Sequence, residues 1–324
     1  MKKIVILGTA TIDIVIKSKE IKVHQLHEAL KLGSKLEVEE AKFYFGGGAM
    51  NVATALKRWR LNPYLFISLG KDEIGQIIKR ALVDKKINCK IFWHKENSPF
   101  SIIILAPTGE RTILVYRGSA GNFSLSDFKK IPTNGNLYYL TSGQMTIDKI
   151  ETLLKSIKKA IKILNPSKNF YTTGDIKNII PLLTALIMNE EEYKYMKLNN
   201  HFTDKDVIEK FKNIILVITH GNRGGYLVWE NKIFFFPAAK VKKVVDKTGA
   251  GDAFSAGFVY AFSQAQKINF ELITKALNYG AFNAASVIQK PGAQEGIASL
   301  KDFRKIKPLL LKEINLNEFQ NFLS

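Results

Sequence analysis

Short runs of apolar residues alternate along this chain with longer amphipathic segments of helical pattern. The short runs predict buried strands, and the longer segments predict helices. Strands and helices in alternation indicate an α/β fold with a mostly parallel sheet covered by helices on both faces. The expected strands are Ile4–Leu7, Tyr64–Leu69, Leu137–Leu140 and Ile214–Thr219, and the expected helices are Asn51–Trp59, Glu73–Lys85, Ile147–Ile163, Ala253–Ala265 and Phe270–Val287.

Two stretches of the chain break this alternation, at residues about 12–45 and 99–117. Each contains a pair of strand-like segments, and the second is typical of a hairpin around a Pro-Thr-Gly-Glu turn. We expect these pieces to form a small β-sheet that stands off the main one as a lid over a ligand cleft. The four expected strand segments are Ile12–Ile16, Leu36–Phe45, Phe100–Ala106 and Arg111–Arg117.

The 324 residues contain no repeat, low-complexity tract or linker that would divide them. This length allows either one large unit or two ordinary domains. We expect a single α/β domain over residues 1–324, with the lid inserted in its core. The segment after Lys301 is Lys-rich and amphipathic. It predicts a packed terminal helix, and a partner-binding appendage is the alternative.

The chain is strongly basic, with 48 Lys and Arg against 29 Asp and Glu and a formal net charge of +19. Such an excess invites a nucleic-acid or membrane-surface partner. However, specific binders of nucleic acid concentrate their charge on one face, whereas these lysines are spread along the whole sequence. A phosphorylated small molecule also suits a basic protein. We expect a small-molecule substrate and neither a nucleic-acid nor a membrane partner.

Cysteine usage and the apolar runs bear on the cellular setting. A single cysteine, Cys89, excludes an internal disulfide framework and a Cys-based zinc site. The apolar run near Met1 is too short for a signal peptide, and the longest apolar stretch falls short of the ~18–20 residues of a membrane span. We therefore expect a cytoplasmic protein.

The most informative segment runs from Asp246 through a glycine-rich turn to Asp252, just before the helix expected at Ala253. Gly249 and Gly251 allow tight backbone geometry and close approach to a ligand. Amide N–H groups at a helix start carry partial positive charge and commonly bind phosphate. Asp252 is either a helix cap or a base that accepts a hydroxyl proton, as phosphoryl transfer requires.

The sequence contains neither a P-loop element nor the Gly-x-Gly-x-x-Gly spacing of a dinucleotide-binding fold. A second glycine-rich element, Gly46–Gly48, precedes Asn51. It allows backbone to lie flat against a ligand while Asn51 offers a donor and an acceptor; the alternative is a tight turn with an Asn cap. The segment from Thr219 to Gly225 is a weak signal by itself.

These residues carry a family resemblance over essentially the whole chain. Asp13, the element Gly46-Gly47-Gly48-Ala49-Met50-Asn51, the run Asn189-Glu190-Glu191-Glu192 and the run Thr248-Gly249-Ala250-Gly251-Asp252 resemble, in order and spacing, the ribokinase-like (PfkB-type) carbohydrate kinases. The resemblance implies a three-layer α/β/α core with a protruding β lid. It also implies an enzyme that transfers the γ-phosphate of ATP to an alcohol, with Mg²⁺ and in some members K⁺.

The resemblance also implies roles for individual residues. Asp252 would be the catalytic base, and the backbone N–H groups of Gly249, Ala250 and Gly251 would form an anion hole over the transferred phosphoryl group. The other implied positions are Asp13, Gly47, Gly48 and Asn51 for substrate hydroxyls, Asn189 and Glu192 for Mg²⁺ largely through waters, Thr219, Gly221, Gly224, Thr248 and Asn283 for the nucleotide, and Asp246, with Thr248 and the Gly292 loop, for a monovalent cation.

The sequence departs from the family pattern at two positions. Lys247 replaces a small or β-branched residue and either adds positive charge near the nucleotide or points to solvent. Arg60 replaces a glycine common after the first helix, where it alters only a helix end. Neither change removes a catalytic group. We therefore expect an active enzyme rather than a non-catalytic binding protein on the same fold.

The acceptor substrate is less determined. Phe43, Tyr44 and Phe45 could stack on a nucleobase, although alternation along a strand turns at least one of them away. Arg111 and Arg117 could hold an acidic or phosphorylated sugar, or be solvated edge charges. We expect a sugar or sugar-like polyol, with a nucleoside as the alternative. The resemblance and the exposed strand edges also suggest a homodimer through the lid.

Overall fold

The computed structural model describes residues 2–17, 35, 37–105, 111–306 and 308–323. Its centre is a ten-stranded sheet in the order β14-β13-β12-β11-β10-β9-β8-β1-β4-β5. From β11 through β5 neighbouring strands run parallel, and β12, β13 and β14 add antiparallel pairs at one edge. The strands are β1 Ile4–Gly8, β4 Tyr64–Gly70, β5 Asn88–His94, β8 Leu137–Thr141, β9 Ile161–Asn165, β10 Ala185–Asn189, β11 Ile215–Thr219, β12 Gly225–Trp229, β13 Lys232–Phe236 and β14 Lys312–Ile314.

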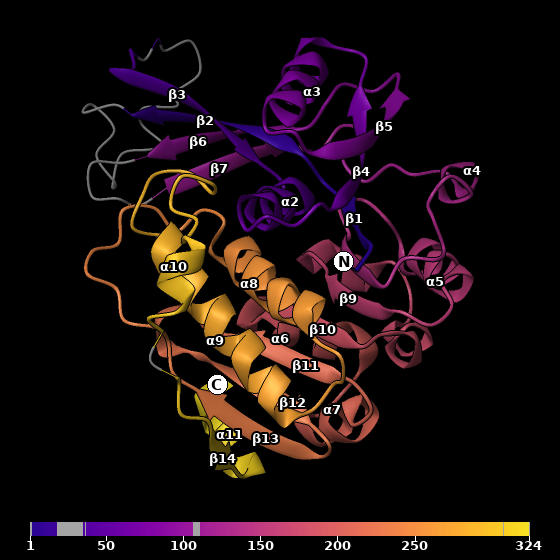
Figure 1. Ribbon diagram of the computed structural model, residues 1–324, viewed down its shortest axis with the longest axis vertical. Helices are drawn as coiled ribbons and strands as arrows, with labels where there is room; N and C mark the ends of the chain where they lie inside the picture. Colours follow the sequence, from indigo (N-terminus) through magenta and orange to yellow (C-terminus); the bar gives the residue numbers. More distant parts are fainter. Residues whose placement is uncertain (1, 18–34, 36, 106–110, 307, 324) are drawn as a thin grey trace.

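Helices cover both faces of this sheet (Figure 1). Alternate residues of β1 show the two sides: Ile4 and Ile6 pack into a core with α2, α3, α8 and α9, whereas Val5 and Leu7 pack into a second core with α5, α6 and α7. The expected three-layer arrangement is therefore confirmed. The α-helices are α2 Gly48–Arg58, α3 Glu73–Asp84, α4 Leu125–Phe128, α5 Ile147–Ser156, α6 Glu190–Asn200, α7 Asp204–Phe211, α8 Ala250–Gln264, α9 Phe270–Val287, α10 Leu300–Phe303 and α11 Leu316–Leu323.

A separate four-stranded sheet in the order β3-β2-β6-β7 stands off the main layers (Figure 1). Strands β2 and β6 pair in parallel, and each pairs antiparallel with an edge strand. The expected lid sheet is confirmed, while residues 18–34, 36 and 106–110, which include the expected hairpin turn, lie outside the described residues. The lid strands are β2 Thr11–Lys17, β3 Glu40–Gly46, β6 Phe100–Leu105 and β7 Arg111–Tyr116.

The helix expected over Ile147–Ile163 is wrong in its second half. Helix α5 ends at Ser156, Ile157 has extended backbone, and Ile161–Asn165 forms β9 between β8 and β10. The apolar residues of this strand continue the apolar pattern of the helix, so the sequence shows no break. The sheet decides the structure because it buries Ile163 and Leu164 on opposite faces.

The C-terminal segment forms the expected packed helix and one further strand. Phe319 of α11 is buried against the rings of Tyr193 and Tyr226, at centroid distances of 5.9 and 5.1 Å. Just before this helix, β14 pairs with β13 and extends the main sheet, which the sequence pattern did not indicate. The partner-binding appendage is not needed to explain the apolar residues of α11.

The two departures from the family pattern lie where they disturb little. Arg60 is exposed just after α2 and has a left-handed backbone, with φ of 64°, which is the geometry a glycine would adopt more easily. Lys247 is exposed, as expected for a side chain that points to solvent. None of the described helices has the length and apolar character needed to span a membrane.

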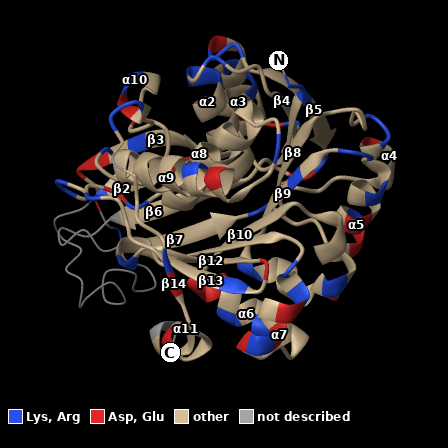
Figure 2. Cartoon of the chain, turned by 60° about the horizontal axis from the view of Figure 1, so that its bottom comes forward, with Lys and Arg blue, Asp and Glu red and all other residues tan. Residues whose placement is uncertain are grey.

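Basic residues do not gather on one helix in the view of Figure 2. Lysines and acidic residues lie side by side on α6 and α7. Several of them form ion pairs, such as Lys194 with Glu190 at 2.8 Å. This interleaving is typical of a solvated surface.

Candidate active site

The glycine-rich turn that precedes α8 has a backbone that depends on Gly249. Gly249 is the residue that caps α8, and its left-handed φ of 74° suits a glycine. A Cβ at Gly249 would lie 2.4 Å from the Cβ of Ala293, whereas a Cβ at Gly251 would meet nothing within 4 Å. The N–H of Ala250 donates to the Lys247 carbonyl at 3.3 Å. The N–H of Gly251 lies in the first turn of α8, where backbone amides have no partner within the helix.

Asp252 lies inside the first turn of α8, so the alternative in which it caps the helix is wrong. Its Oδ2 accepts a hydrogen bond from Nδ2 of Asn51 at 2.7 Å. Burial raises the pKa of Asp252 to about 6; the Asn51 bond lowers it, and the charge of Asp13 raises it further. A carboxylate that titrates near neutrality is suited to accept a proton from an alcohol.

Gln294 is a part of this site that the sequence reasoning missed. Its side chain is buried, and its Nε2 donates to Oδ1 of Asn51 at 2.9 Å. That bond occupies the acceptor end of the Asn51 amide and leaves the donor end facing Asp252. Asn51 lies within α2, which begins at Gly48, so the Asn-cap alternative is also wrong. A lone glutamine in a loop of small residues offers no sequence signal for this contact.

We expect Gln294→Met to shift the acid limb of the pH–activity profile upward from a midpoint near 6. Without the glutamine, the Asn51 amide can rotate and present its oxygen to Asp252, which removes the hydrogen bond that lowers the pKa of Asp252. Loss of one such bond corresponds to about a tenfold lower kcat at neutral pH. The profiles of kcat and of kcat/KM between pH 5 and 9 measure the lower kcat and the shifted acid limb.

The matched control is Gln289→Met, because Gln289 donates a hydrogen bond of the same 2.9 Å length to the Ala285 carbonyl within its own segment. It should leave the profile unchanged. An unshifted acid limb in Gln294→Met would show that Gln294 only fills space.

Asp13 and the glycine element meet at the root of the lid. Asp13 on β2 accepts hydrogen bonds from the hydroxyls of Ser101, at 2.5 Å, and Thr11, at 3.4 Å. Burial raises the pKa of Asp13. A Cβ on Gly46 would lie 2.4 Å from the Asp13 carboxylate, and one on Gly48 would lie 3.0 Å from that of Asp252. The absence of side chains at these glycines therefore lets the backbone lie close to both carboxylates.

Gly47 and Thr9 shape the backbone that connects the lid to α2. Gly47 precedes α2 with φ of 88°, and the N–H of Gly48 donates to Oγ1 of Thr9 at 3.1 Å. Ser101 and Thr9 were missed in the sequence because single hydroxyl residues in strands carry no specific signal. The four residues predicted for substrate hydroxyls, Asp13, Gly47, Gly48 and Asn51, are thus brought together beside Asp252.

Asp246 fastens the glycine-rich turn to the loop after α9. Its two carboxylate oxygens accept the N–H groups of Thr248, at 2.8 Å, and Gly292, at 2.9 Å. The two segments predicted to surround a monovalent cation therefore do meet. In the described contacts, Asp246 has a structural role: it connects the glycine-rich turn to the loop that contains Gly292.

Asn189 and Glu192 form a reciprocal cap at the start of α6. Asn189 Oδ1 accepts the N–H of Glu192 at 2.8 Å, and Glu192 Oε2 accepts the N–H of Asn189 at 2.9 Å. Burial raises the pKa of Glu192 to about 7, and the charges of Asp252 and Glu191 raise it as well. A divalent cation near Glu192 and Asp252 would relieve their mutual repulsion.

The carboxylates near Asn189 suit Mg²⁺ bound together with substrate phosphates better than they suit a metal ion held by protein side chains alone. Among the described residues, no three His, Cys, Asp or Glu side chains lie close enough to hold a metal by themselves. Mg²⁺ usually keeps several waters and binds one or two carboxylates together with substrate phosphates. Glu192 and Asp252 provide that small number of carboxylates.

The predicted nucleotide loop follows β11. Thr219 ends this strand directly beside Asn189 of β10. Gly224 has φ of 95°, and a Cβ there would lie 2.2 Å from the Phe236 carbonyl oxygen, so this turn requires glycine. At Gly221 a Cβ would meet nothing within 4 Å, which leaves that side of the loop open.

His220 and Asn283 both make structural contacts. The buried His220 contacts the carboxylate of Glu190 at the start of α6 and so connects the loop to that helix. Asn283 is buried, donates to the Ala253 carbonyl at 2.8 Å and accepts from the N–H of Ala298 at 3.0 Å. The structure does not bring the side chain of Asn283 into the open site; it fastens α9 to α8.

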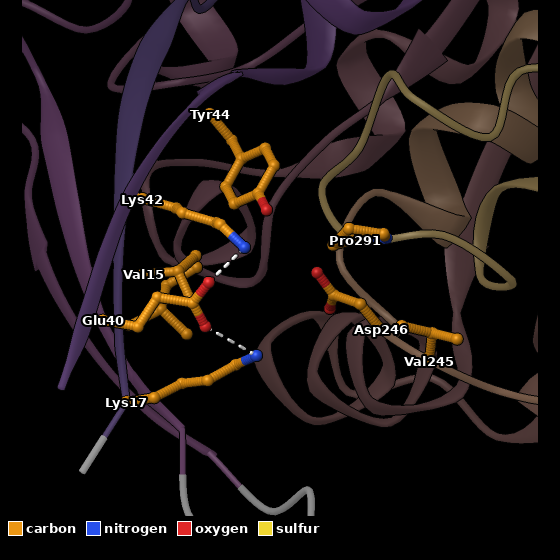
Figure 3. Close-up of a pocket in the computed structure, with 9 residues that line it drawn as sticks. Val15, Lys17, Glu40, Lys42, Tyr44, Val245, Asp246 and Pro291 are labelled. Atoms are coloured by element: carbon orange, nitrogen blue, oxygen red, sulfur yellow. Dashed lines mark ion pairs between the residues drawn. The ribbon is translucent and has the colours of Figure 1, made fainter.

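A cavity of about 150 Å³ lies between the lid and the turn at Asp246 (Figure 3). Tyr44 faces this cavity from β3, while its neighbour Phe43 is 70% exposed on the other face of the lid. Of the three aromatic residues considered in the sequence, Tyr44 is thus the one that lines this cavity. Arg117 is exposed, and the side chain of Arg111 lies outside the described part of the chain.

The chain is similar over its length to known proteins. The sequence model of the "pfkB family carbohydrate kinase" matches residues 1–300. A nucleoside kinase of Methanocaldococcus jannaschii is 24% identical over 305 residues, covering 92% of this chain and 94% of that protein. A ribokinase of Staphylococcus aureus is 25% identical over 321 residues, covering 94% and 99%.

Solved structures show the same architecture. Arabidopsis thaliana ribokinase, solved in complex with ribose and ATP, matches with a TM-score of 0.74 at 20% identity and covers 94% of this chain and 98% of that one. At this identity the likeness establishes the fold. The expected ribokinase-like fold is confirmed.

Proposed function

We propose that this chain, which belongs to the pfkB family of carbohydrate kinases, transfers the γ-phosphate of ATP to an alcohol group of a sugar or sugar-like polyol. Membership makes the chain a phosphotransferase of the sugar and nucleoside kinases. The observation that carries the finer proposal is the Asn51–Asp252 pair at the start of α8, next to a glycine-rich turn. It combines a base for the alcohol with amides for the phosphoryl group.

In the proposed reaction, Asp252 acts on the acceptor alcohol and the backbone amides at the start of α8 act on the phosphoryl group. Asp252 accepts the proton of the acceptor hydroxyl while Asn51 holds its other oxygen in place. The alcohol oxygen forms the new bond to the γ-phosphorus as the bond from that phosphorus to the β–γ bridging oxygen breaks, and ADP leaves. The N–H groups at the start of α8 stabilise the charge on the transferred group, and the proton remains on Asp252 until product release.

Mg²⁺ is proposed to bind near Asn189 and Glu192, largely through waters, where it would neutralise phosphate charge. The second carboxylate oxygen of Glu192, beside the one that accepts the Asn189 N–H, and the effect of the Asp252 charge on Glu192 support this site. A monovalent cation such as K⁺ is proposed near Asp246 and Thr248, on the resemblance alone.

ATP is proposed to lie over the loop from Thr219 to Gly224, with Thr248 on the same side. The open face at Gly221 supports this placement. The solved relative with ribose and ATP is in keeping with ATP as donor. Asn283 would act indirectly, since its amide supports the start of α8 through the Ala253 carbonyl. A kinase that uses ATP also agrees with the cytoplasmic location expected from the sequence.

The acceptor hydroxyls are proposed to bind Asp13, Gly47, Gly48 and Asn51. A nucleoside is the second candidate, because Tyr44 faces the cavity and could stack on a base. ATP consumption with a panel of pentoses, hexoses, sugar acids, sugar phosphates and nucleosides decides between them. Turnover confined to nucleosides would replace the sugar proposal, and no turnover with any acceptor would favour a non-catalytic binding protein.

We further propose a homodimer through the lid. The edge strand β7 exposes four consecutive apolar residues, from Ile113 to Tyr116, and Phe43 is 70% exposed on the opposite edge strand β3. Apolar groups on a sheet edge favour association with another chain. A second copy of the lid offers a matching apolar surface.

Phe43→Lys is expected to convert this dimer to a monomer, because a charge placed within an apolar contact must be desolvated. Light scattering coupled to size-exclusion chromatography measures the mass. Leu198→Lys is the matched control, since Leu198 is also 70% exposed but lies on α6. A wild-type protein that is already monomeric, or equal masses for both variants, would contradict the lid dimer.

A further inference from the structure

The proposed magnesium element, residues 189–192, and the proposed nucleotide loop, residues 219–224, leave the main sheet at neighbouring positions. Strands β10 and β11 pair in parallel and lie side by side (Figure 1), and their last paired residues are Asn189 and Thr219. Oγ1 of Thr219 donates to the Met188 carbonyl at 3.4 Å. Beyond this pair the chain enters α6 on one side and the loop on the other, so the strand ladder no longer fixes the distance between them.

The residue that follows each strand supplies a side chain that connects the two segments. Nε2 of His220 contacts Oε2 of Glu190. A second contact to the same oxygen comes from the far end of the loop, where Nη2 of Arg223 lies 3.6 Å away. The loop is closed on itself, because the N–H of His220 donates to the Gly224 carbonyl at 2.7 Å. Glu190 therefore contacts both ends of the loop, and the open position at Gly221 lies between them.

The contact between His220 and Glu190 is shielded from water and charge-assisted. The side chain of His220 is 6% exposed and that of Glu190 is 22% exposed. The ammonium of Lys194 lies 2.8 Å from the other oxygen of Glu190 and favours its ionised form. An ionised carboxylate only accepts hydrogen bonds, so Nε2 of His220 carries the hydrogen at this contact. Hydrogen bonds to an ionised partner are roughly twice as strong as those between neutral groups.

Each of the two segments also has closing contacts of its own. Helix α6 has the reciprocal cap between Asn189 and Glu192. The loop has the backbone hydrogen bond from His220 to Gly224. Burial of an imidazole and a carboxylate costs free energy unless the two groups are paired. What the pairing adds is a fixed relation between the segment proposed to bind the nucleotide and the segment proposed to bind the metal.

We propose that Glu190 and His220 are positioning residues, which form a bridge that sets the distance between the nucleotide loop and the magnesium element. One complex of ATP with Mg²⁺ then contacts both segments. The inference rests on the proposed kinase function and adds how its donor site is assembled. Neither residue acts on the transferred group. The bridge raises the fraction of molecules in which the two segments are in register, and the apparent affinity for ATP with Mg²⁺ follows that fraction.

The test measures binding of a non-hydrolysable ATP analogue by calorimetry, once with Mg²⁺ and once with EDTA in its place. His220→Leu removes the hydrogen at the contact and keeps the site filled. With Mg²⁺ it should weaken binding about tenfold, or ~1.4 kcal/mol, whereas binding without Mg²⁺ should change by less than about twofold. In turnover, the KM for ATP should rise by a similar factor and the KM for the acceptor should stay the same. Glu190→Ala, which breaks the contact from the less buried side, should reproduce this pattern.

His220→Gln is the conservative variant, because the amide nitrogen of glutamine reaches about as far as Nε2 of histidine and can donate to Glu190. It should restore most of the affinity measured with Mg²⁺. The matched control is Lys194→Met, since Lys194 contacts the other oxygen of the same carboxylate from within α6. It should leave binding unchanged both with and without Mg²⁺.

Equal losses of affinity with and without Mg²⁺ in His220→Leu and Glu190→Ala would show that the pair only stabilises the loop, and would overturn the bridge. A wild-type protein whose affinity for the analogue does not depend on Mg²⁺ would overturn it as well. In both cases, turnover of an acceptor would leave the kinase function standing. The binding measurements need no acceptor. The expected pattern therefore supports the bridge even if no acceptor is phosphorylated, in which case the kinase proposal alone fails.

Discussion

Replacing Asp252 by asparagine should lower kcat by about 10²–10⁴-fold, the contribution of a positioned general base. Asparagine keeps the shape of the side chain and can still contact Asn51, but it cannot accept the proton of the acceptor alcohol. The affinity for ATP should change little, because the amides at the start of α8 remain. Single-turnover kinetics and ATP binding by calorimetry measure the two effects separately.

The same variant should be more stable than the wild type at pH 8. Burial raises the pKa of Asp252 from 3.8 to about 6, so the folded protein must keep a buried charge that the unfolded chain holds in water. Removing that charge is worth up to about 3 kcal/mol. Since wild-type Asp252 is protonated in the folded state below pH 6, the gain should shrink there and vanish near pH 4.

Asp148→Asn is the control for both measurements, because Asp148 also lies in the first turn of a helix, α5, but is exposed. It should alter neither turnover nor the pH dependence of stability. If Asp252→Asn retained wild-type turnover, Asp252 would lose its proposed role as base. A stability gain that is equal at pH 4 and pH 8 would contradict its burial as a charge.

Gly249→Ala should both destabilise the protein and abolish most of its activity. A left-handed backbone costs an alanine about 1–2 kcal/mol, and the new Cβ would lie 2.4 Å from that of Ala293. Overpacking of this kind adds about 1–3 kcal/mol. The turn must shift to relieve the contact, which displaces the amides of the proposed anion site.

Thermal unfolding and turnover of the same sample measure this prediction. Gly251→Ala is the control for stability, because a Cβ at that position meets nothing within 4 Å. Its melting temperature should stay within about a degree or two of the wild type, as expected of a substitution outside any strained feature. Equal melting temperatures for the two variants would show that Gly249 does not need its left-handed geometry.

A structural feature could be predicted from the sequence where one short segment contains all of its residues. The turn from Asp246 to Asp252 was recognisable because its glycines, its acid and the following helix are contiguous, and Phe270–Val287 was predicted with both of its ends correct. The lid strands were recognisable from their turn and alternation. The resemblance then supplied the roles that residue types alone leave open.

The missed features are contacts between distant segments. Gln294 and Asn51 are 243 positions apart, and Ser101 and Asp13 are 88 apart, so no local pattern could connect either pair. The helix expected over Ile147–Ile163 failed for a related reason. The choice between helix and strand at Ile161–Asn165 is made by the neighbouring strands, which a local pattern does not contain.

The pairing of β14 with β13 has a consequence for the newborn chain on the ribosome. The segment Lys232–Phe236 places three aromatic residues in a row beside Ile233, and its outer edge stays open until Lys312–Ile314 has been synthesised. A strand of this composition with a free edge pairs readily with copies of itself. We therefore expect β14 to protect the open edge of β13 from aggregation. A chain whose translation stops before β14 should form inclusion bodies instead of a folded, truncated protein.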